Sequence, residues 1–188
     1  MKKLLFLAAA ALLLLGCQRP ADGDYTFHIL TTNDIHGTYF DSNYADGSVT
    51  NSLFAVNTYV DSIRHAEGKE NVILLDAGDF LQGDNAAYYF NYVDSTAGHI
   101  YPRMAEYMGY DAIIGGNHDI ETGHDVYDGI AADLVKRGIP FLAGNAIRND
   151  NGKPYFPVYT VLKRNGVKIA VRGYDNANIK AWLNESLW

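Results

Sequence analysis

Residues 71–80 read NVILLDAGDF, and this stretch decides the fold class. Four consecutive apolar side chains, Val72 to Leu75, form a run that is too short and too unbroken for an amphipathic helix. The run therefore predicts a strand that is buried on both faces, which is typical of a parallel sheet covered by helices. It ends in Asp76-Ala77-Gly78-Asp79, where polar side chains and a glycine begin a loop.

The same unit, a buried strand followed by a polar loop, occurs on both sides of this stretch. Residues 25–32 form an apolar-rich segment that ends at Asn33-Asp34, and Ala112-Ile113-Ile114 precede Gly115-Gly116. Helices are predicted at about 51–65, 101–110 and 126–136, with a fourth strand at 140–143. This alternation indicates an α/β fold with a largely parallel sheet. Farther along, Asn165-Gly166 predicts a hairpin between strands at 159–163 and 167–173, and residues 178–188 look helical.

Three loops, each directly after a predicted strand, carry residues suited to metal binding. Because the carboxyl ends of the strands in an open α/β sheet converge on one crevice, residues far apart in sequence can meet there. Asp34 and His36 are two apart in an extended segment and offer an oxygen and a nitrogen to one metal ion. Asp79 can bridge two metal ions with its two oxygens, and Asn117 adds a neutral carbonyl oxygen. A Gly-Asn-His-acid sequence is expected by chance only about 0.005 times in this composition, so Gly116 to Asp119 is the most specific of the three loops.

These residues resemble the calcineurin-like metallophosphoesterase family, specifically its exported 5′-nucleotidase and 2′,3′-cyclic phosphodiesterase branch. The segments Thr31–Gly37 and Gly115–Gly123 carry the resemblance, which covers roughly residues 25–185. It implies a metallophosphoesterase-type αββα sandwich, of which this chain is the N-terminal part of the catalytic domain. It also implies hydrolysis of phosphoesters, most of all nucleotides, with two divalent metal ions (Mn, Zn, Co or Mg) as cofactors.

The resemblance assigns a role to each matching residue. Asp34, His36 and Asp79 would bind the first metal, while Asp79 and Asn117 would bind the second. His118 would bind no metal but would stabilise the substrate phosphate, held in place by an acid. The family acid is usually an Asp three positions after this histidine; that position is Glu121 here, and Asp119 is a rival for the role.

The sequence also departs from the family pattern. The family completes its metal sites with three further histidines, two of them in a G-H-x-H motif, whereas no histidine follows His124 here. The C-terminal substrate-binding domain, with its arginines and base-stacking aromatic residues, is missing as well. We therefore expect a portion of a longer enzyme that is inactive by itself. Two alternatives stay open: a thiosulfohydrolase-type member of the same family, and a non-catalytic surface lipoprotein that keeps the fold.

The N-terminus predicts export. Lys2 and Lys3 precede an apolar run from Leu4 to Leu15, which would span only about 18 Å as a helix, well short of a bilayer core. Leu14-Leu15-Gly16-Cys17 resembles a bacterial lipobox, although an ordinary signal peptide with an incidental Cys is the alternative. We expect a lipoprotein signal peptide at 1–16, lipidation at Cys17, a tether at 17–24 and the catalytic portion at 25–188. The mature protein would be a membrane-anchored lipoprotein, periplasmic or at the cell surface.

Charge and the remaining polar residues complete the prediction. The 188 residues carry 15 Lys and Arg against 22 Asp and Glu, a net charge of −7 without a basic cluster, which disfavours a nucleic acid polymer as partner. An anionic small-molecule substrate would then need metal ions for its cationic site. His124 could stand in as a metal ligand, but a role in a loop or at a helix start is favoured. The remaining interpretations are Asp76 binding loop amides behind the metal site, Asp84 solvated, His99 at the surface, and Tyr88, Tyr89 and Tyr92 engaged in packing.

Overall fold

The computed structural model describes residues 22–188 except residue 44 and residues 95–97. The predicted signal peptide, Cys17 and most of the predicted tether lie outside the described residues. Within the described part of the chain, no helix combines the length and the apolar character that crossing a membrane requires.

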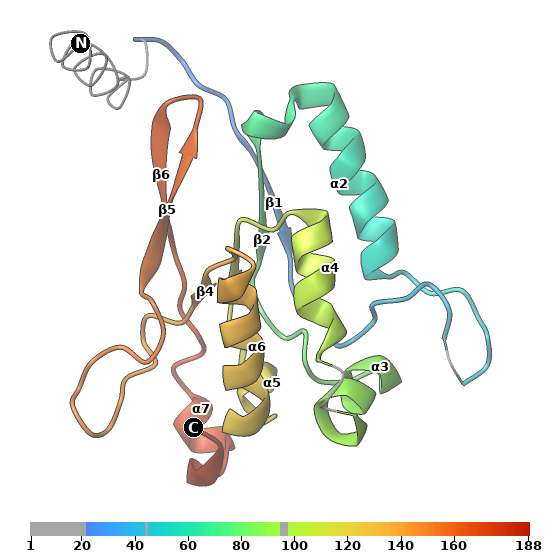
Figure 1. The fold of residues 1–188 in the computed structure, drawn as a ribbon, viewed down its shortest axis with the longest axis vertical. Coiled ribbons are helices and arrows are strands. Elements are labelled where there is room, and N and C mark those ends of the chain that lie inside the picture. Colours follow the sequence, from blue (N-terminus) through green and yellow to red (C-terminus); the bar gives the residue numbers. More distant parts are fainter. Residues whose placement is uncertain (1–21, 44, 95–97) are drawn as a thin grey trace, which may run out of the picture.

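A four-stranded parallel sheet forms the centre of the fold (Figure 1). Its strands are β1 (His28–Thr32), β2 (Val72–Asp76), β3 (Ala112–Ile114) and β4 (Phe141–Leu142), in the order β1-β2-β3-β4. Thr32 pairs with Asp76, Asp76 pairs with Ile113, and Ile114 pairs with Leu142. The carboxyl ends of the strands therefore lie at one edge of the sheet, and the predicted α/β fold with a parallel sheet is confirmed.

Three main helices connect the strands. They are α2 (Leu53–Glu67), α4 (Ile100–Met108) and α6 (His124–Lys136). The Ser52 side chain caps α2 by accepting a hydrogen bond from the backbone N–H of Ala55. Because parallel strands in sequential order are joined by right-handed crossovers, all three helices cover the same face of the sheet.

A two-stranded antiparallel sheet, β5 (Tyr159–Arg164) and β6 (Val167–Arg172), follows the parallel sheet. Figure 1 shows β1 and β2 between this hairpin and α2. Arg164 forms an ion pair with Asp111 beside β3, and the Asn165 side chain donates a hydrogen bond to Asn71 beside β2. The second sheet therefore packs along the first, as an incomplete αββα sandwich requires.

Short helical segments differ most from the sequence-based expectation. The chain forms α3 (Asn85–Tyr88), which continues as a π-helix (Tyr89–Val93), and α5 (Asn117–Ile120), none of which the sequence predicts. The helix expected at 178–188 is only α7 (Ile179–Trp182) and a 3₁₀ turn at Glu185–Leu187; another 3₁₀ turn, Lys69–Asn71, precedes β2. Four-residue helices are shorter than the window that a helical period needs, so the pattern of apolar residues does not reveal them.

Two single-residue predictions are wrong. Asp84 is not simply solvated, because its side chain caps α3 by accepting a hydrogen bond from Ala86 N–H. His99 does not lie at the surface: it is 8% exposed, and its Nδ1 accepts a hydrogen bond from the N–H of Tyr101 at the start of α4. Burial lowers the pKa of His99 to about 4.

The core extends under the loops that follow the strands. Phe80, directly after Asp79, is fully buried and stacks on Tyr101 with 3.9 Å between the ring centroids. The buried hydroxyl of Tyr39, in the loop after β1, donates a 2.6 Å hydrogen bond to the Phe80 carbonyl. Both loops are thus held by apolar packing as well as by the sheet.

Candidate metal centre

The loops after β1, β2 and β3 are hydrogen-bonded to one another. The N–H of Asp34 donates to the Gly78 carbonyl at 3.0 Å, and the N–H of His36 donates to the Asp79 carbonyl at 2.9 Å. The N–H of His118 donates to Asp79 Oδ1 at 2.8 Å, which fixes one oxygen of that carboxylate. The convergence that the sequence predicts for these loops is therefore present in the backbone.

Three side chains form a cluster that could hold a metal ion. Ligand atoms of His36, Asp79 and His118 all lie within 4.8 Å of one another. Asp34 is adjacent, with Oδ1 3.8 Å from His36 Nε2. Asn117 is the first residue of α5 and stands between Gly116 and His118 in the third loop. The structure thus places all four predicted ligands on the converging loops, and it adds His118 to the cluster.

Backbone strain is concentrated at the predicted ligands. Among the described residues, the non-glycine residues with positive φ are Asp34 (51°), His36 (47°), Asp79 (60°) and Asn165 (51°). Asn165 belongs to the hairpin turn, where Asn is favoured. The other three are predicted metal ligands, and a left-handed conformation costs an L-residue about 1–2 kcal/mol. Strain of this kind typically occurs at functional sites.

Two glycines allow the second and third loops to touch. A Cβ atom at Gly116 would lie 2.2 Å from Asp79 Oδ1, and one at Gly78 would lie 2.6 Å from the backbone of Gly116. A side chain at either position would push these loops apart and move the Asp79 carboxylate.

Glu121, and not Asp119, lies beside the His118 imidazole. The distance from His118 Nδ1 to Glu121 Oε2 is 3.0 Å. The Glu121 carboxylate raises the pKa of His118, which favours the charged imidazolium. Because residues three apart share one face of a helical turn, this pairing follows from the geometry of α5 and the residue after it.

Asp119 is instead fully buried, and its carboxylate connects two loops by hydrogen bonds. Its Oδ1 accepts hydrogen bonds from the N–H groups of Phe80 and Leu81, at 2.9 and 2.8 Å. Its Oδ2 accepts from Asp79 and Gly116, both at 2.9 Å. Burial raises the pKa of Asp119, whereas the bonds from Gly116 and Leu81 oppose the rise. The carboxylate organises the backbone around Asp79.

Asp76 has a similar place behind the site, as the sequence predicts. Its side chain is buried and accepts hydrogen bonds from Gly78 N–H at 2.8 Å, Thr32 Oγ1 at 2.9 Å and the Tyr101 hydroxyl at 2.7 Å. Burial raises the pKa of Asp76 to about 6.

Gln82 is a site residue that the sequence analysis missed. His36 Nδ1 lies 3.0 Å from the Gln82 backbone oxygen and 3.1 Å from its side-chain oxygen. Both oxygens can only accept, so Nδ1 carries the proton and the lone pair is on Nε2, the nitrogen that faces Asp34. No sequence signal connects Gln82 with His36, since 46 positions separate them.

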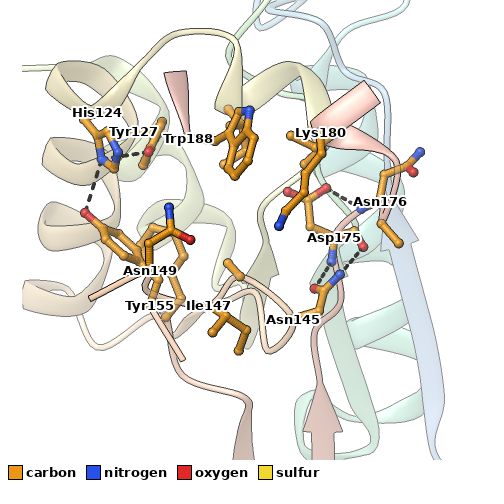
Figure 2. A pocket seen from close by; sticks show the side chains of 15 residues that line it. His124, Tyr127, Asn145, Ile147, Asn149, Tyr155, Asp175, Asn176, Lys180 and Trp188 are labelled. Atoms are coloured by element: carbon orange, nitrogen blue, oxygen red, sulfur yellow. Dashed lines mark hydrogen bonds between the residues drawn. The ribbon is translucent and has the colours of Figure 1, made fainter. Parts of the chain in front are cut away.

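His124 lies apart from this cluster, at the start of α6 as predicted. Its Nδ1 is 2.7 Å from the Tyr127 hydroxyl and 3.0 Å from Asp128 Oδ2. Figure 2 shows His124 and Tyr127 on one side of a pocket of about 290 Å³, with Asp175 on the other. Burial raises the pKa of Asp175 to about 7, and the Asp79 carboxylate adds to the rise. Asp175 is therefore a second residue that the sequence analysis missed, within electrostatic reach of the site.

Tyr88, Tyr89 and Tyr92 pack against neighbouring rings, as expected, but much of their surface stays exposed. Tyr88 is 59% exposed and Tyr92 is 53% exposed, and Tyr89 is exposed as well. The Tyr88 and Tyr92 rings contact each other, with 5.2 Å between their centroids.

Comparisons with known proteins agree with this geometry. The chain is 33% identical over 157 residues to a 5′-nucleotidase from Diplobatis ommata, a match that covers 79% of this chain and 25% of that protein. It is 32% identical over 156 residues to protein UshA from Salmonella pullorum, covering 81% and 26%. No family model matches the chain.

Solved structures share the fold. The calcineurin-like phosphoesterase YfkN from Bacillus subtilis superposes with a TM-score of 0.69 at 24% identity, covering 83% of this chain and 50% of that one. The sulfate thiohydrolase SoxB from Thermus thermophilus superposes with a TM-score of 0.68 at 15% identity, covering 88% and 38%. The chain spans about a quarter of the length of the curated relatives that it matches. By sequence and fold together, this chain belongs to the calcineurin-like metallophosphoesterase family, in the branch that contains the 5′-nucleotidases.

Proposed function

We propose that this chain supplies part of a di-metal centre that hydrolyses phosphoesters, with nucleotides as the substrate class. The observation that carries the proposal is the cluster of His36, Asp79 and His118, next to Asp34, on loops whose backbone is strained at the predicted ligands. The 5′-nucleotidases among its relatives support the choice of nucleotides.

The donor set fits divalent metal ions. Asp34, His36 and Asp79 would hold one ion, while Asp79 and Asn117 would hold the other; Mn, Zn, Co or Mg all accept such nitrogen and oxygen ligands. Because the Gln82 oxygens accept the proton of His36 Nδ1, the lone pair on Nε2 is available to a metal ion. The hydrogen bond from His118 N–H uses only one lone pair of Asp79 Oδ1, so this carboxylate can still bind metal. When bound, the ions would neutralise the phosphate and lower the pKa of a water ligand.

The His118–Glu121 pair would act on the substrate itself. Glu121 favours the imidazolium form of His118, so this side chain can offer a positive N–H group to the phosphoryl oxygens as negative charge builds on them. Glu121 is the positioning residue. Asp119 would keep Asp79 and the loop before His118 at a fixed separation through its four hydrogen bonds.

The four predicted ligands provide three protein groups for one metal and two for the other, which is few for tight binding. We therefore propose that the 188-residue chain alone binds Mn²⁺ weakly and hydrolyses nucleotides near the background rate. The thiosulfohydrolase alternative shares this fold with SoxB, so the substrate has to be tested directly.

The test compares Asp79→Asn with His118→Asn in the same chain. Calorimetry should show that Asp79→Asn loses Mn²⁺ binding, because a carboxylate shared by both sites is removed. His118→Asn should keep the metal. In the longer enzyme of which we propose this chain is a part, the same substitution should lower the release of phosphate from AMP by about 10²–10³. Loss of metal in both variants would contradict the non-ligand role of His118. Release of sulfate from a thiosulfate ester, without release of phosphate from AMP, would favour the alternative.

We also propose that the mature protein is exported and anchored through an acylated Cys17. Several acyl chains on one cysteine bind a membrane more tightly than a single chain does. The chain should incorporate labelled palmitate and sediment with membranes, and Cys17→Ala should do neither. Equal membrane retention of the two proteins would refute the anchor.

A further inference from the structure

Tyr101 lies on α4, behind the candidate metal centre, and is fully buried. Its ring stacks on Phe80, with 3.9 Å between the centroids and 15° between the ring planes. Its hydroxyl donates a 2.7 Å hydrogen bond to Asp76 Oδ2. One side chain therefore contacts both the last residue of β2 and the loop that follows this strand.

These two contacts act on either side of Asp79, the residue predicted to bridge two metal ions. Phe80 follows Asp79 directly in the chain. On the other side, Asp76 Oδ1 accepts a 2.8 Å hydrogen bond from the N–H of Gly78, the residue before Asp79. Tyr101 thus holds the backbone before Asp79 through Asp76, and the backbone after it through Phe80.

The same hydrogen bonds extend to the loop after β1. The Gly78 carbonyl accepts a 3.0 Å hydrogen bond from the N–H of Asp34. Asp76 Oδ2, the oxygen that binds the Tyr101 hydroxyl, also accepts a 2.9 Å hydrogen bond from Thr32 Oγ1 at the end of β1. A shift of the Asp76 carboxyl would therefore move the backbone beside a predicted metal ligand in each of the two loops.

The Asp76 carboxyl depends on these donors because it is buried. It is 0% exposed, and a buried carboxyl without hydrogen-bond partners is strongly disfavoured. Its Oδ2 binds the hydroxyl groups of Tyr101 and Thr32, while its Oδ1 binds Gly78 N–H. Loss of the Tyr101 hydroxyl would leave Oδ2 with one of these two bonds. The carboxyl would then rotate more freely and hold Gly78 less firmly.

We propose that Tyr101 is a positioning residue of the metal centre, whose hydroxyl orients the Asp76 carboxyl and thereby fixes Asp34 and Asp79 at the separation that metal binding needs. This inference rests on the proposed function, because it assigns a role toward the metal ions proposed there. Tyr101 has no exposed surface, so it acts through Asp76 and not on the substrate. Replacing a residue that orients metal ligands from behind typically costs about 10–100-fold in metal affinity.

The experiment measures two properties of the 188-residue chain. Mn²⁺ binding is followed by electron paramagnetic resonance, and hydrogen exchange of the Asp34 amide is followed by NMR in the presence of EDTA. Tyr101→Phe keeps the stacked ring and removes only the hydroxyl, so it should weaken Mn²⁺ binding about tenfold. It should also speed exchange of the Asp34 N–H, which donates to Gly78, by about fivefold, the factor expected for one weakened hydrogen bond.

Two further positions provide the controls. Tyr127→Phe removes another buried tyrosine hydroxyl, which lies 2.7 Å from His124 Nδ1 and outside the metal cluster. It should leave Mn²⁺ affinity and Asp34 exchange unchanged, even where it lowers the melting temperature as much as Tyr101→Phe does. Thr32→Val removes the second hydroxyl at Asp76 Oδ2 and should reproduce the effects of Tyr101→Phe, whereas Thr32→Ser keeps a hydroxyl and should behave as the wild type.

The proposal is overturned if Tyr101→Phe binds Mn²⁺ as tightly as the wild type, or if Tyr127→Phe weakens Mn²⁺ binding equally. A wild-type chain that binds no Mn²⁺ would refute the proposed metal centre itself. In that case unchanged Asp34 exchange in Tyr101→Phe would separately refute the positioning role, so the two failures are distinguishable.

Discussion

Replacing Asp119 with Asn should destabilise the chain by about 2–4 kcal/mol, although the two side chains have nearly the same shape. Each carboxylate oxygen of Asp119 accepts two backbone N–H groups, from Phe80 and Leu81 on one oxygen and from Asp79 and Gly116 on the other. An Asn amide has only one oxygen, so its NH₂ group would face two N–H donors.

The magnitude follows from those two donors. A buried N–H group that loses its acceptor costs about 1–3 kcal/mol, so two cost about 2–6 kcal/mol. Removing a carboxyl that is fully buried recovers part of this, because burial disfavours its charged form. The net loss should be about 2–4 kcal/mol.

Urea unfolding followed by circular dichroism measures this loss. With a slope of about 2 kcal/mol per molar urea, the midpoint should fall by roughly 1–2 M. Glu121→Gln is the matched control: its side chain is partly exposed and contacts one imidazole, so stability should change by less than about 0.5 kcal/mol. An unchanged midpoint for Asp119→Asn, or a larger loss for Glu121→Gln, would refute the roles given to the two acids.

Three further predictions concern other features of the chain. Burial lowers the pKa of His99 to about 4, so the folded chain is fully stable with respect to this group above about pH 6.5 and loses stability as the pH falls toward 4. His99→Asn keeps the cap of α4 but removes the titrating group. Between pH 7 and pH 5, the unfolding free energy of this variant should therefore fall by about 2 kcal/mol less than that of the wild type. Asp34→Gly should stabilise the chain by about 0.5–1 kcal/mol, because glycine adopts the left-handed backbone without strain, at some cost in entropy. Asn165→Gly is the control and should change the stability little. If both variants raise the melting temperature equally, the backbone at Asp34 is not specially strained. Mn²⁺ at ten times its dissociation constant should stabilise the wild type by about 1.4 kcal/mol but not Asp79→Asn, and an equal shift of both melting temperatures would place the metal elsewhere.

The main elements of the fold could be predicted because their signals are local. The apolar run before Asp76 marks a buried strand wherever it occurs, and Ser52 and Asn165-Gly166 act on their immediate neighbours. The positions of Asp34, His36 and Asp79 followed from the rule that parallel strands end at one edge.

The contacts that were missed depend on pairs distant in sequence or on the direction of single side chains. Gln82 reaches His36 across 46 positions, and Asp175 approaches Asp79 only through the packing of the second sheet. The sequence alone leaves open whether Asp119 or Glu121 holds His118, although helical geometry favours the acid three positions after His118. A prediction of α5 as a helix would have decided it.

The buried carboxylate of Asp119 also links the candidate metal centre to the order of folding. Its bonds to the loop after β2 span 38 to 40 positions, and closing a flexible loop of that length costs about 3 kcal/mol of chain entropy. This cost is recovered only after α4 and β3 have docked against β2, so the cluster around Asp79 cannot form ahead of the crossover that encloses it. We therefore expect a nascent chain to bring the predicted ligands together late, after about 120 residues have left the ribosome, so that an early metal ion would find separate ligands in place of a site.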